Sequence, residues 1–436
     1  MARKIILCTI GSLGDLHPFI ALGLALKAQG FAPLIGVPAS LVEKVERAGL
    51  SAFAIMPAFE DLWAALDMTQ EQAVIRVMAD QNFMISKIAL RVLAEGAEAL
   101  DAHAHGAEAI IGSYFALAAP IIAEKRGIPY VPAILQPMTI LSAYDPPIGQ
   151  GFGTIGSARK GSLGRRWNRL CFAVIRRVIR HRYGGAINKV RLAHGLGPQV
   201  STPILDLESN HPLRIALYSH VIAPTQPDFP VNIHHVGFPV FDSDSGAVET
   251  LDPELEAFLA AGDPLVFTLG SMVTSAPGDF YRESAEAARA LGRRALLLTG
   301  NDDLASTEDV MVRAYAPHSL VFPRAAAIIH HGGIGTTGAA LRAGRPQLIV
   351  PHMGDQWDNG ARVARLGAGS VLGSKRYTAA RAARSLGALT NQPCYAERAA
   401  SLANDISGEN GAVTAASAIS ALLASITACP SAPITI

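Results

Sequence analysis

Three glycine-containing turns in this sequence carry polar side chains of the kind that bind phosphate or move protons. The first, residues 11–18, reads GSLGDLHP and places Asp15 and His17 directly after an apolar run. The second, residues 330–337, reads HHGGIGTT, and the third, residues 351–359, reads PHMGDQWDN. Glycine lets a backbone turn tightly beneath a ligand, and the free N–H groups of a helix start attract anions. The sequence therefore predicts a phosphate site with carboxylates and imidazoles close to it.

Each of these turns separates a short apolar run from a helical pattern. In the first half we predict strands at 4–10, 32–37, 109–112 and 130–135, with helices at 17–29, 41–48 and 117–125 and a mostly helical insertion at 59–104. In the second half we predict strands at 264–269, 294–299, 326–330 and 347–351, with helices at 280–291, 336–343, 355–366 and 412–424. Strands that alternate with helices predict parallel sheets, which bind ligands at the carboxyl ends of their strands.

The expected fold class is therefore α/β, with two Rossmann-like doubly wound domains. We predict the first domain at 1–220, a linker rich in proline, aspartate and serine at 221–250, and the second domain at 251–436. The last helix is expected to be able to pack back on the first domain.

Composition excludes several classes of protein. The chain has 436 residues, of which 50% are hydrophobic and 17% charged, so wholesale disorder is excluded. The net charge of +1 gives no reason to expect a nucleic-acid binder. The four cysteines are scattered, without the spacing of a disulfide framework or a zinc site. The longest apolar stretch, 109–123, is short for a membrane span, so we expect a cytoplasmic protein.

Two of the motifs have a second interpretation. Asp15 could simply cap the helix that follows it. Residues 333–338 also fit GxGxxG, the dinucleotide fingerprint, with Asp355 after the following strand. That fingerprint normally opens its domain at the first strand, whereas here it lies several strands into the second half, behind a pair of histidines. A nicotinamide enzyme is therefore disfavoured.

Taken together, the motifs resemble those of family 1 nucleotide-sugar glycosyltransferases of the GT-B fold, in which two Rossmann-like domains face a cleft. The resemblance rests on the GSxGDxxPF start, the YAP at 315–317, HHGGIGTT and PHMGDQWDN, and it spans essentially the whole chain. It is strongest to bacterial rhamnosyltransferases that build rhamnolipids, through residues 141–147, 237–242 and 267–271.

The resemblance implies an enzyme that binds an acceptor in the first domain and a nucleotide sugar in the second. Such an enzyme would move a hexosyl group, with inversion, from a dTDP-rhamnose-like or UDP-glucose-like donor to a hydroxyl of a lipid or other apolar acceptor. Asp15 matches the catalytic base, and His17 is its rival. Ser113 stands where relatives with a histidine base carry an orienting aspartate, and its presence fits a carboxylate base.

The resemblance also assigns the donor site. His331, Gly332, Gly333, Gly335 and Thr336 match the diphosphate-binding turn, Ser271 a phosphate contact, Asp355 and Gln356 the sugar-binding pair, and Tyr315 and Pro317 the pocket for the base. Ala339 stands where plant UDP-sugar enzymes carry a ribose-binding glutamate, a departure compatible with a dTDP-sugar. No cofactor and no metal site are expected, because no acidic or histidine cluster of that kind is present and His331 and the turn amides would meet the leaving-group charge.

The segment 159–191 contains eleven Lys and Arg and no acid, with apolar residues at helical spacing. Such a helix can lie on an anionic membrane, or it can pack on the first domain with its basic face in water, which we favour. The 59–104 insertion is expected to help build a lipophilic acceptor pocket. Two other functions stay open: a sugar-nucleotide epimerase of the GT-B fold, which would need extra acid/base carboxylates, and a noncatalytic partner chain, which the intact Asp15 and His331 disfavour.

Overall fold

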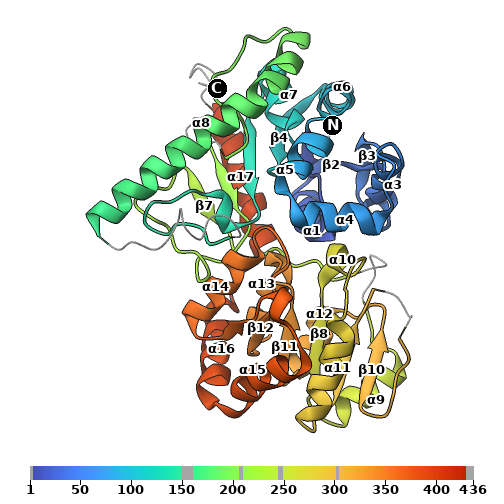
Figure 1. Ribbon diagram of the computed structural model, residues 1–436. Coiled ribbons are helices and arrows are strands. Elements are labelled where there is room, and N and C mark those ends of the chain that lie inside the picture. The colour runs from blue at the N-terminus through green and yellow to red at the C-terminus, as the bar shows by residue number, and fades with distance from the viewer. Residues whose placement is uncertain (1–2, 150–160, 206–209, 244–248, 301–303, 429–436) are drawn as a thin grey trace.

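The computed structural model describes residues 3–149, 161–205, 210–243, 249–300 and 304–428, which fold into two α/β domains (Figure 1). Each domain is built on one parallel sheet, with strand order β3-β2-β1-β4-β5-β6-β7 in the first and β10-β9-β8-β11-β12-β13 in the second. In both sheets the chain enters at a central strand, winds out to one edge, returns and winds to the other. The predicted fold class of two Rossmann-like domains is confirmed.

The first sheet separates two apolar layers. Its strands are β1 (Arg3–Cys8), β2 (Phe31–Pro38), β3 (Ser51–Met56), β4 (Ala107–Gly112), β5 (Tyr130–Ile134), β6 (Arg214–Ala216) and β7 (Ile233–His235). Side chains along a strand alternate between the two faces. Ile5 and Leu7 accordingly join one buried cluster, and Ile6 and Cys8 join the other.

The helices of the first domain include the predicted helical insertion. They are α1 (Leu13–Ala28), α2 (Val42–Arg47), α3 (Phe59–Ala64), α4 (Gln70–Ala79), α5 (Gln81–Phe83), a π-helical segment at Met84–Ala89, α6 (Leu93–His103), α7 (Ala118–Arg126) and α8 (Ser162–Ala193). Helix α1 begins one turn earlier than the predicted 17–29, because Ser12 and Asp15 form a capping box. Pro18 consequently lies inside the helix instead of in its first turn.

The second domain repeats this architecture. Its strands are β8 (Leu265–Thr268), β9 (Ala295–Leu298), β10 (Val310–Arg313), β11 (Ala327–His330), β12 (Gln347–Ile349) and β13 (Gly369–Val371). Its helices are α9 (Pro253–Ala260), α10 (Gly270–Val273), α11 (Phe280–Ala290), α12 (His318–Val321), α13 (Ile334–Arg342), α14 (Gln356–Leu366), α15 (Ala379–Asn391) and α16 (Pro393–Ile406).

The last helix, α17 (Gly411–Ala428), lies in the first domain (Figure 1). Its Ala415, Ala416, Ile419 and Leu423 belong to the cluster that α1 builds. The stretch Pro393–Ala428 is long and apolar enough to span a membrane by composition, but it consists of two helices whose apolar faces pack into protein cores. About a third of its most apolar window, 33%, is buried in the protein.

The segment 221–250, predicted as a linker, also contributes to a sheet. Strand β7 lies within it and forms the edge of the first sheet beside β6. Phe238, a few residues later, is buried with Ile134 of the first domain and Ile334 of the second. This segment therefore joins the domains through a shared apolar core.

Candidate active site

Asp15 lies at the carboxyl end of β1, in the first turn of α1. The Ser12 backbone N–H donates to its Oδ2 at 2.9 Å, and the Ser12 hydroxyl lies 3.4 Å from the same oxygen. A Cβ on Gly11, whose φ is +152°, would lie 2.1 Å from that oxygen, so glycine is needed there. Burial raises the pKa of Asp15 to about 6, against the lowering effect of the Ser12 bonds. The residue does cap its helix, and it is also a carboxylate whose basicity is greater than that of an ordinary aspartate.

His17 lies on a different side of α1, since residues two apart on a helix do not share a face. Its ring meets the edge of Phe241, from the segment that joins the domains, with 5.4 Å between centroids. Ser113 stands next to the turn that carries Asp15: the Thr9 hydroxyl donates to Ser113 Oγ at 3.0 Å and lies 3.4 Å from the Asp15 carbonyl. Ser113 therefore supports the turn, and no carboxylate occupies its position.

The two adjacent histidines of the second domain have different environments. His330 is completely buried, its Nε2 lies 2.9 Å from Gln347 Oε1, and its Nδ1 accepts the Gly332 N–H at 3.1 Å. These bonds fix the tautomer with the proton on Nε2. His331 lies in the turn itself, and burial and then the neighbouring His330 hold its pKa well below the ordinary range. His331 is thus a neutral imidazole that can donate one hydrogen bond, while His330 is structural.

Glycines surround His331 on two sides. A Cβ on Gly333 would lie 2.4 Å from its Nε2, and a Cβ on Gly270 would lie 2.4 Å from its Cε1. Gly332 has φ +96°, and a Cβ there would lie 2.9 Å from the Gln356 carbonyl oxygen. The turn from β8 and the turn from β11 therefore meet at this imidazole, which places the exposed Ser271 beside it. The exposed Gly335 and the partly exposed Thr336 lie in the first turn of α13.

Asp355 and Gln356 lie at the start of α14. Gln356 Oε1 accepts the backbone N–H groups of His352 and Met353, at 2.7 and 3.0 Å, so this oxygen holds the turn in place. Asn359 Nδ2 donates to Asp355 Oδ2 at 2.7 Å and to the Gly332 carbonyl at 2.9 Å. Asn359 thereby joins the predicted sugar-binding turn to the predicted diphosphate-binding turn. The sequence pointed to the 351–359 turn that contains Asn359, but not to this bridge between the two turns.

The pKa of Asp355 is affected by a charge on the opposite domain. Burial raises its pKa to about 7, the Asn359 bond opposes this rise, and the charges of Asp15 and Asp358 add to it. Asp15 of the first domain therefore lies within electrostatic range of Asp355. The predicted base and the predicted sugar-binding residue border one site.

An ion-pair network holds the domains together next to this site. Arg362 pairs with Asp358 at 2.7 Å on its own helix and with Asp145 of the first domain. Arg365 pairs with Asp145 at 2.8 Å, and Asp358 Oδ1 accepts the Ile148 backbone N–H at 3.0 Å. Because α14 begins at the predicted sugar-binding turn, these contacts fix that turn relative to the first domain.

Tyr315 and Pro317 directly precede α12 in the second domain. The Tyr315 ring is exposed, and its hydroxyl donates to Asp242 Oδ1 at 3.3 Å, while the buried Pro317 caps α12. Ala339 lies on α13 and packs against the cluster of α9 and β9 side chains. The predicted base pocket therefore contains a partly exposed tyrosine, and position 339 carries no carboxylate.

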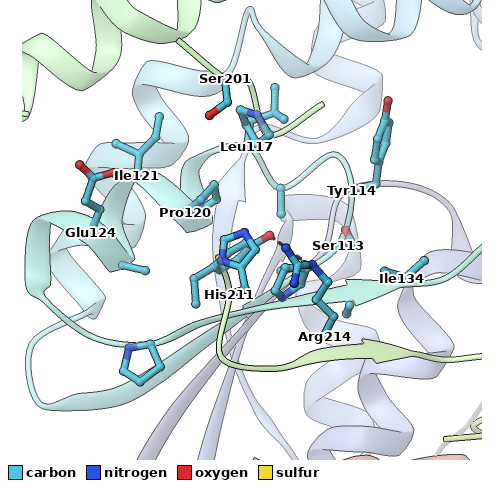
Figure 2. A pocket seen from close by; sticks show the side chains of 18 of the residues that line it. Ser113, Tyr114, Leu117, Pro120, Ile121, Glu124, Ile134, Ser201, His211 and Arg214 are labelled. Carbon is cyan, nitrogen blue, oxygen red and sulfur yellow. Dashed lines mark hydrogen bonds between the residues drawn. The ribbon is translucent and has the colours of Figure 1, made fainter. Parts of the chain in front are cut away.

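A cavity of about 360 Å³ lies in the first domain between α7, α8, β5 and the chain before β6. Figure 2 shows a wall of mixed character, in which the apolar Leu117, Pro120, Ile121 and Ile134 stand among the polar Ser113, Tyr114, Ser201, His211 and Arg214. Two further polar residues of the lining, Glu124 and Arg191, pair with each other at 2.7 Å. This cavity is not lined by the 59–104 insertion, whose Phe83 and Met84 are buried in the domain core. That the insertion helps to build an acceptor pocket stays a prediction.

Within the described ranges, no group of three or more histidine, cysteine, aspartate or glutamate side chains is arranged to hold a metal ion. The charged and polar groups at the cleft are instead the carboxylates, the imidazole and the turn amides described above.

Comparison with known proteins gives these residues their context. A model for the N-terminal domain of family 28 glycosyltransferases matches residues 5–144, and one for the C-terminal domain of erythromycin biosynthesis protein CIII-like proteins matches residues 299–422. Among solved structures, the glycotransferase of kitacinnamycin has a TM-score of 0.70 at 18% identity, covering 97% of this chain and 100% of its own. The spinosyn rhamnosyltransferase SpnG, complexed with thymidine diphosphate, has a TM-score of 0.62 at 19% identity, covering 96% and 100%.

Curated relatives share more sequence. The glycosyltransferase GtfE of Amycolatopsis orientalis is 32% identical over 387 residues, 84% of this chain and 85% of its own. The O-mycaminosyltylonolide 6-deoxyallosyltransferase of Streptomyces fradiae is 29% identical over 414 residues, 94% of each chain. A sterol 3-beta-glucosyltransferase of Candida albicans is 28% identical over 95% of this chain and 27% of its own. These relatives do not establish the expected closeness to rhamnolipid enzymes, but they show that the chain belongs to the family 1 nucleotide-sugar glycosyltransferases of the GT-B fold.

Proposed function

We propose that this glycosyltransferase moves a hexosyl group, with inversion, from a dTDP-sugar to a hydroxyl of an acceptor with a large apolar part. The observation that carries the proposal is that Asp15 lies within electrostatic range of Asp355, whose turn Asn359 joins to the His331 turn. A base on one domain and a diphosphate-binding turn on the other are the two parts that a direct displacement needs. The epimerase alternative is not favoured by the family relationship.

In this reaction the acceptor hydroxyl oxygen attacks C1 of the donor sugar from the face opposite the diphosphate. A new C1–O bond forms as the bond from C1 to the diphosphate oxygen breaks. The hydroxyl proton passes to Asp15, and the nucleoside diphosphate leaves with the electron pair. The raised pKa of Asp15, about 6, makes it a better base than an ordinary aspartate and leaves it mostly ionised at neutral pH. His17 is the weaker candidate because its ring packs on Phe241.

In this proposal the negative charge of the leaving diphosphate would be stabilised without a metal ion. His331 is neutral, so it would donate one hydrogen bond to a phosphate oxygen, and the amides at the start of α13 add their dipoles. Ser271 would contact the phosphate from the facing turn. Such preorganised donors stabilise charge that develops in the transition state.

Two observations support a dTDP-sugar. Ala339 offers no acceptor for a ribose hydroxyl, and the exposed Tyr315 ring offers a face on which a base and its methyl group can pack. The structurally similar SpnG is described as a rhamnosyltransferase complexed with thymidine diphosphate. A dTDP-deoxyhexose such as dTDP-rhamnose is the donor we propose, with Asp355 and Gln356 beside its hydroxyls.

The apolar part of the cavity wall between α7 and α8 supports an acceptor with an apolar part, such as an alkyl chain like those of rhamnolipid precursors. One end of the wall is formed by Ser113, whose Oγ accepts a hydrogen bond from the Thr9 hydroxyl, which also lies 3.4 Å from the Asp15 carbonyl. Ile121→Phe would fill part of the cavity without adding a polar group. We expect this variant to raise the acceptor KM at least several-fold for long alkyl acceptors and less for short ones. An equal change for both lengths would remove the cavity from acceptor binding.

The proposal is tested by a nucleotide-binding panel followed by product analysis. A bound nucleoside diphosphate stabilises the fold by mass action, so dTDP should raise the melting temperature of the wild-type protein. His331→Ala should lose most of this shift, while the control His234→Ala, at an exposed site on β7, should keep it. A retained shift in His331→Ala would exclude His331 from the donor site. Mass spectrometry of the product then separates transfer to an acceptor from epimerisation of the free nucleotide sugar.

A further inference from the structure

The N-terminal half of α8 exposes a row of large apolar side chains. Leu163, Trp167, Leu170, Val174 and Val178 are 78, 43, 59, 53 and 55% exposed. Their spacing of three and four residues places them on one face of the helix, over about 22 Å at the usual rise per residue. We call these five residues the apolar stripe. The sequence favoured a helix that buries such residues in its domain, and for these five that interpretation is wrong.

The opposite face of the helix accounts for this exposure, because it already makes the contacts with the domain. Phe172 and Asn168 are buried there, and Asn168 Nδ2 donates to the Ala143 carbonyl at 3.1 Å. Farther along, Tyr183 and Ile187 enter the core of the first domain. The helix is therefore held firmly from one side, and the stripe faces away from the protein. Figure 1 shows α8 along the outer edge of the first domain.

The charges around the stripe all have one sign. Helix α8 contains nine lysines and arginines and no aspartate or glutamate. Arg166 and Arg177 are exposed and lie next to the stripe by their helical position, and Arg169 lies farther round, over the Tyr144 ring at 5.9 Å. An apolar row bordered by cations fits a surface that is apolar inside and anionic at its rim.

We propose that the apolar stripe of α8 docks this enzyme on an anionic lipid membrane. The side chains of the stripe would enter the boundary between headgroups and acyl chains, and the bordering arginines would meet lipid phosphates. A second copy of this chain is a poorer occupant, because a symmetric contact would bring two arginine rims together with no acid on either helix. The proposal stands apart from the proposed transfer reaction, because docking needs neither donor nor acceptor.

The location of the stripe also suits an enzyme for apolar acceptors. Ile187 and Arg191, in the C-terminal half of the same helix, line the cavity between α7 and α8. A membrane-docked α8 would therefore bring that cavity close to the lipid phase. This relation rests on the acceptor proposal, whereas docking itself does not.

Vesicle co-sedimentation tests the proposal directly. Wild-type protein should bind vesicles of phosphatidylcholine with 30% phosphatidylglycerol at low salt, bind pure phosphatidylcholine at least tenfold more weakly, and release as salt is raised. The double variant Leu170→Glu with Val174→Glu should lose at least tenfold in affinity for the anionic vesicles. The control Val231→Glu with Val413→Glu changes two exposed valines on other surfaces and should bind like wild type.

Two further measurements show whether a loss of vesicle binding in the stripe variant comes from the stripe or from a damaged fold. Circular dichroism and the dTDP-induced thermal shift should be the same in wild type and in both double variants, which shows that the fold and the donor site are intact. Vesicle binding by the stripe variant equal to that of wild type would overturn the proposal. A wild-type dimer that the stripe variant converts to a monomer, with no vesicle binding by either, would assign the stripe to a second copy instead.

Discussion

Asp15 of the first domain lies close enough to Asp355 of the second for its charge to raise the pKa of Asp355, after the larger effect of burial. Each carboxylate is also held by its own helix start, Asp15 by Ser12 and Asp355 by Asn359. Two carboxylates within electrostatic range repel each other when both are ionised. Asp15 would accept a hydrogen bond from the hydroxyl of the acceptor substrate. Asp355 would accept hydrogen bonds from the hydroxyls of the donor sugar. The proposed chemistry depends on this arrangement.

This repulsion and the burial of both groups predict how stability depends on pH. The pKa values of Asp15 and Asp355, about 6 and about 7, lie above that of an unfolded aspartate, so the folded protein binds protons more tightly than the unfolded one. The stabilisation from these protons is complete below pH ~4 and is lost as pH rises through 6 and 7. Asp15→Asn removes one such group and should gain stability over wild type at pH 7.5 but not at pH 4.

The gain should be on the order of 1–2 kcal/mol, after discounting for the partial exposure of Asp15. Urea unfolding at the two pH values measures it. Asp405→Asn, at an exposed position on α16, is the control and should show no such pH-dependent difference. A gain for Asp15→Asn that is equal at both pH values would contradict the raised pKa.

Gly270 predicts a more local effect. Its φ is +69° and a Cβ would collide with the His331 ring, whereas Gly278 has φ +54° and open space around it. Gly270→Ala and Gly278→Ala therefore carry a similar backbone strain of about 1 kcal/mol, but only the first displaces the imidazole. We expect nucleoside-diphosphate affinity to fall at least tenfold in Gly270→Ala and to stay within about twofold in Gly278→Ala. Calorimetric titration with dTDP measures both affinities. Equal affinities in the two variants would mean that the position of the His331 ring does not depend on this turn.

The two arginines of the interdomain ion pairs should contribute unequally to the free energy of unfolding. Arg362 and its partner Asp358 are almost fully buried, while Arg365 is half exposed. Arg362→Ala would leave a buried carboxylate unpaired and should cost about 3–5 kcal/mol, whereas Arg365→Ala should cost less than about 1 kcal/mol. Thermal and urea unfolding of both variants measure the difference. A similar, small cost for both would show that the network does not hold the domains together.

Donor choice is predicted from position 339. A carboxylate that accepts bonds from ribose hydroxyls contributes about 1.5–3 kcal/mol, and Ala339 cannot supply it. We therefore expect dTDP to compete against a donor at least as well as UDP does. Inhibition constants for the two nucleotides against one donor provide the test. A UDP constant ten or more times lower than that of dTDP would require a ribose-binding group elsewhere and would contradict a dTDP-sugar donor.

The sequence predicted those parts of the fold that repeat over many residues. The central strands of both sheets and helices such as α1, α11 and α14 were recognised because their apolar periodicity extends over several turns or alternations. The strands β3, β6, β7, β10 and β13 and the helices α15 and α16 were not predicted. For the three-residue strands β6, β7 and β13, so few residues show no period and their pairing is set by neighbours distant in the chain. The same limit applies to α1, whose start depends on the capping bond between Ser12 and Asp15.

The site was predictable to the extent that it lies in short motifs. The turn motifs identified Asp15, His331 and Asp355, and the structure shows each of them at a strand's carboxyl end. The contacts between motifs could not be read from the sequence: Gly270 against His331, and Asn359 joining two turns. The apolar stripe of α8 shows the same limit in another form, since helical spacing alone does not tell which apolar face the domain covers.

The central claim, that Asp15 is the base, is most directly tested by comparing Asp15→Asn with His17→Ala. Asp15→Asn keeps the shape of the side chain and removes its basicity. Its kcat should fall by about 10²–10⁴ while the thermal shift with dTDP stays close to that of wild type. His17→Ala should keep its kcat within about tenfold, because its ring packs on Phe241. An active Asp15→Asn together with an inactive His17→Ala that still binds dTDP would contradict the account and assign the base to His17.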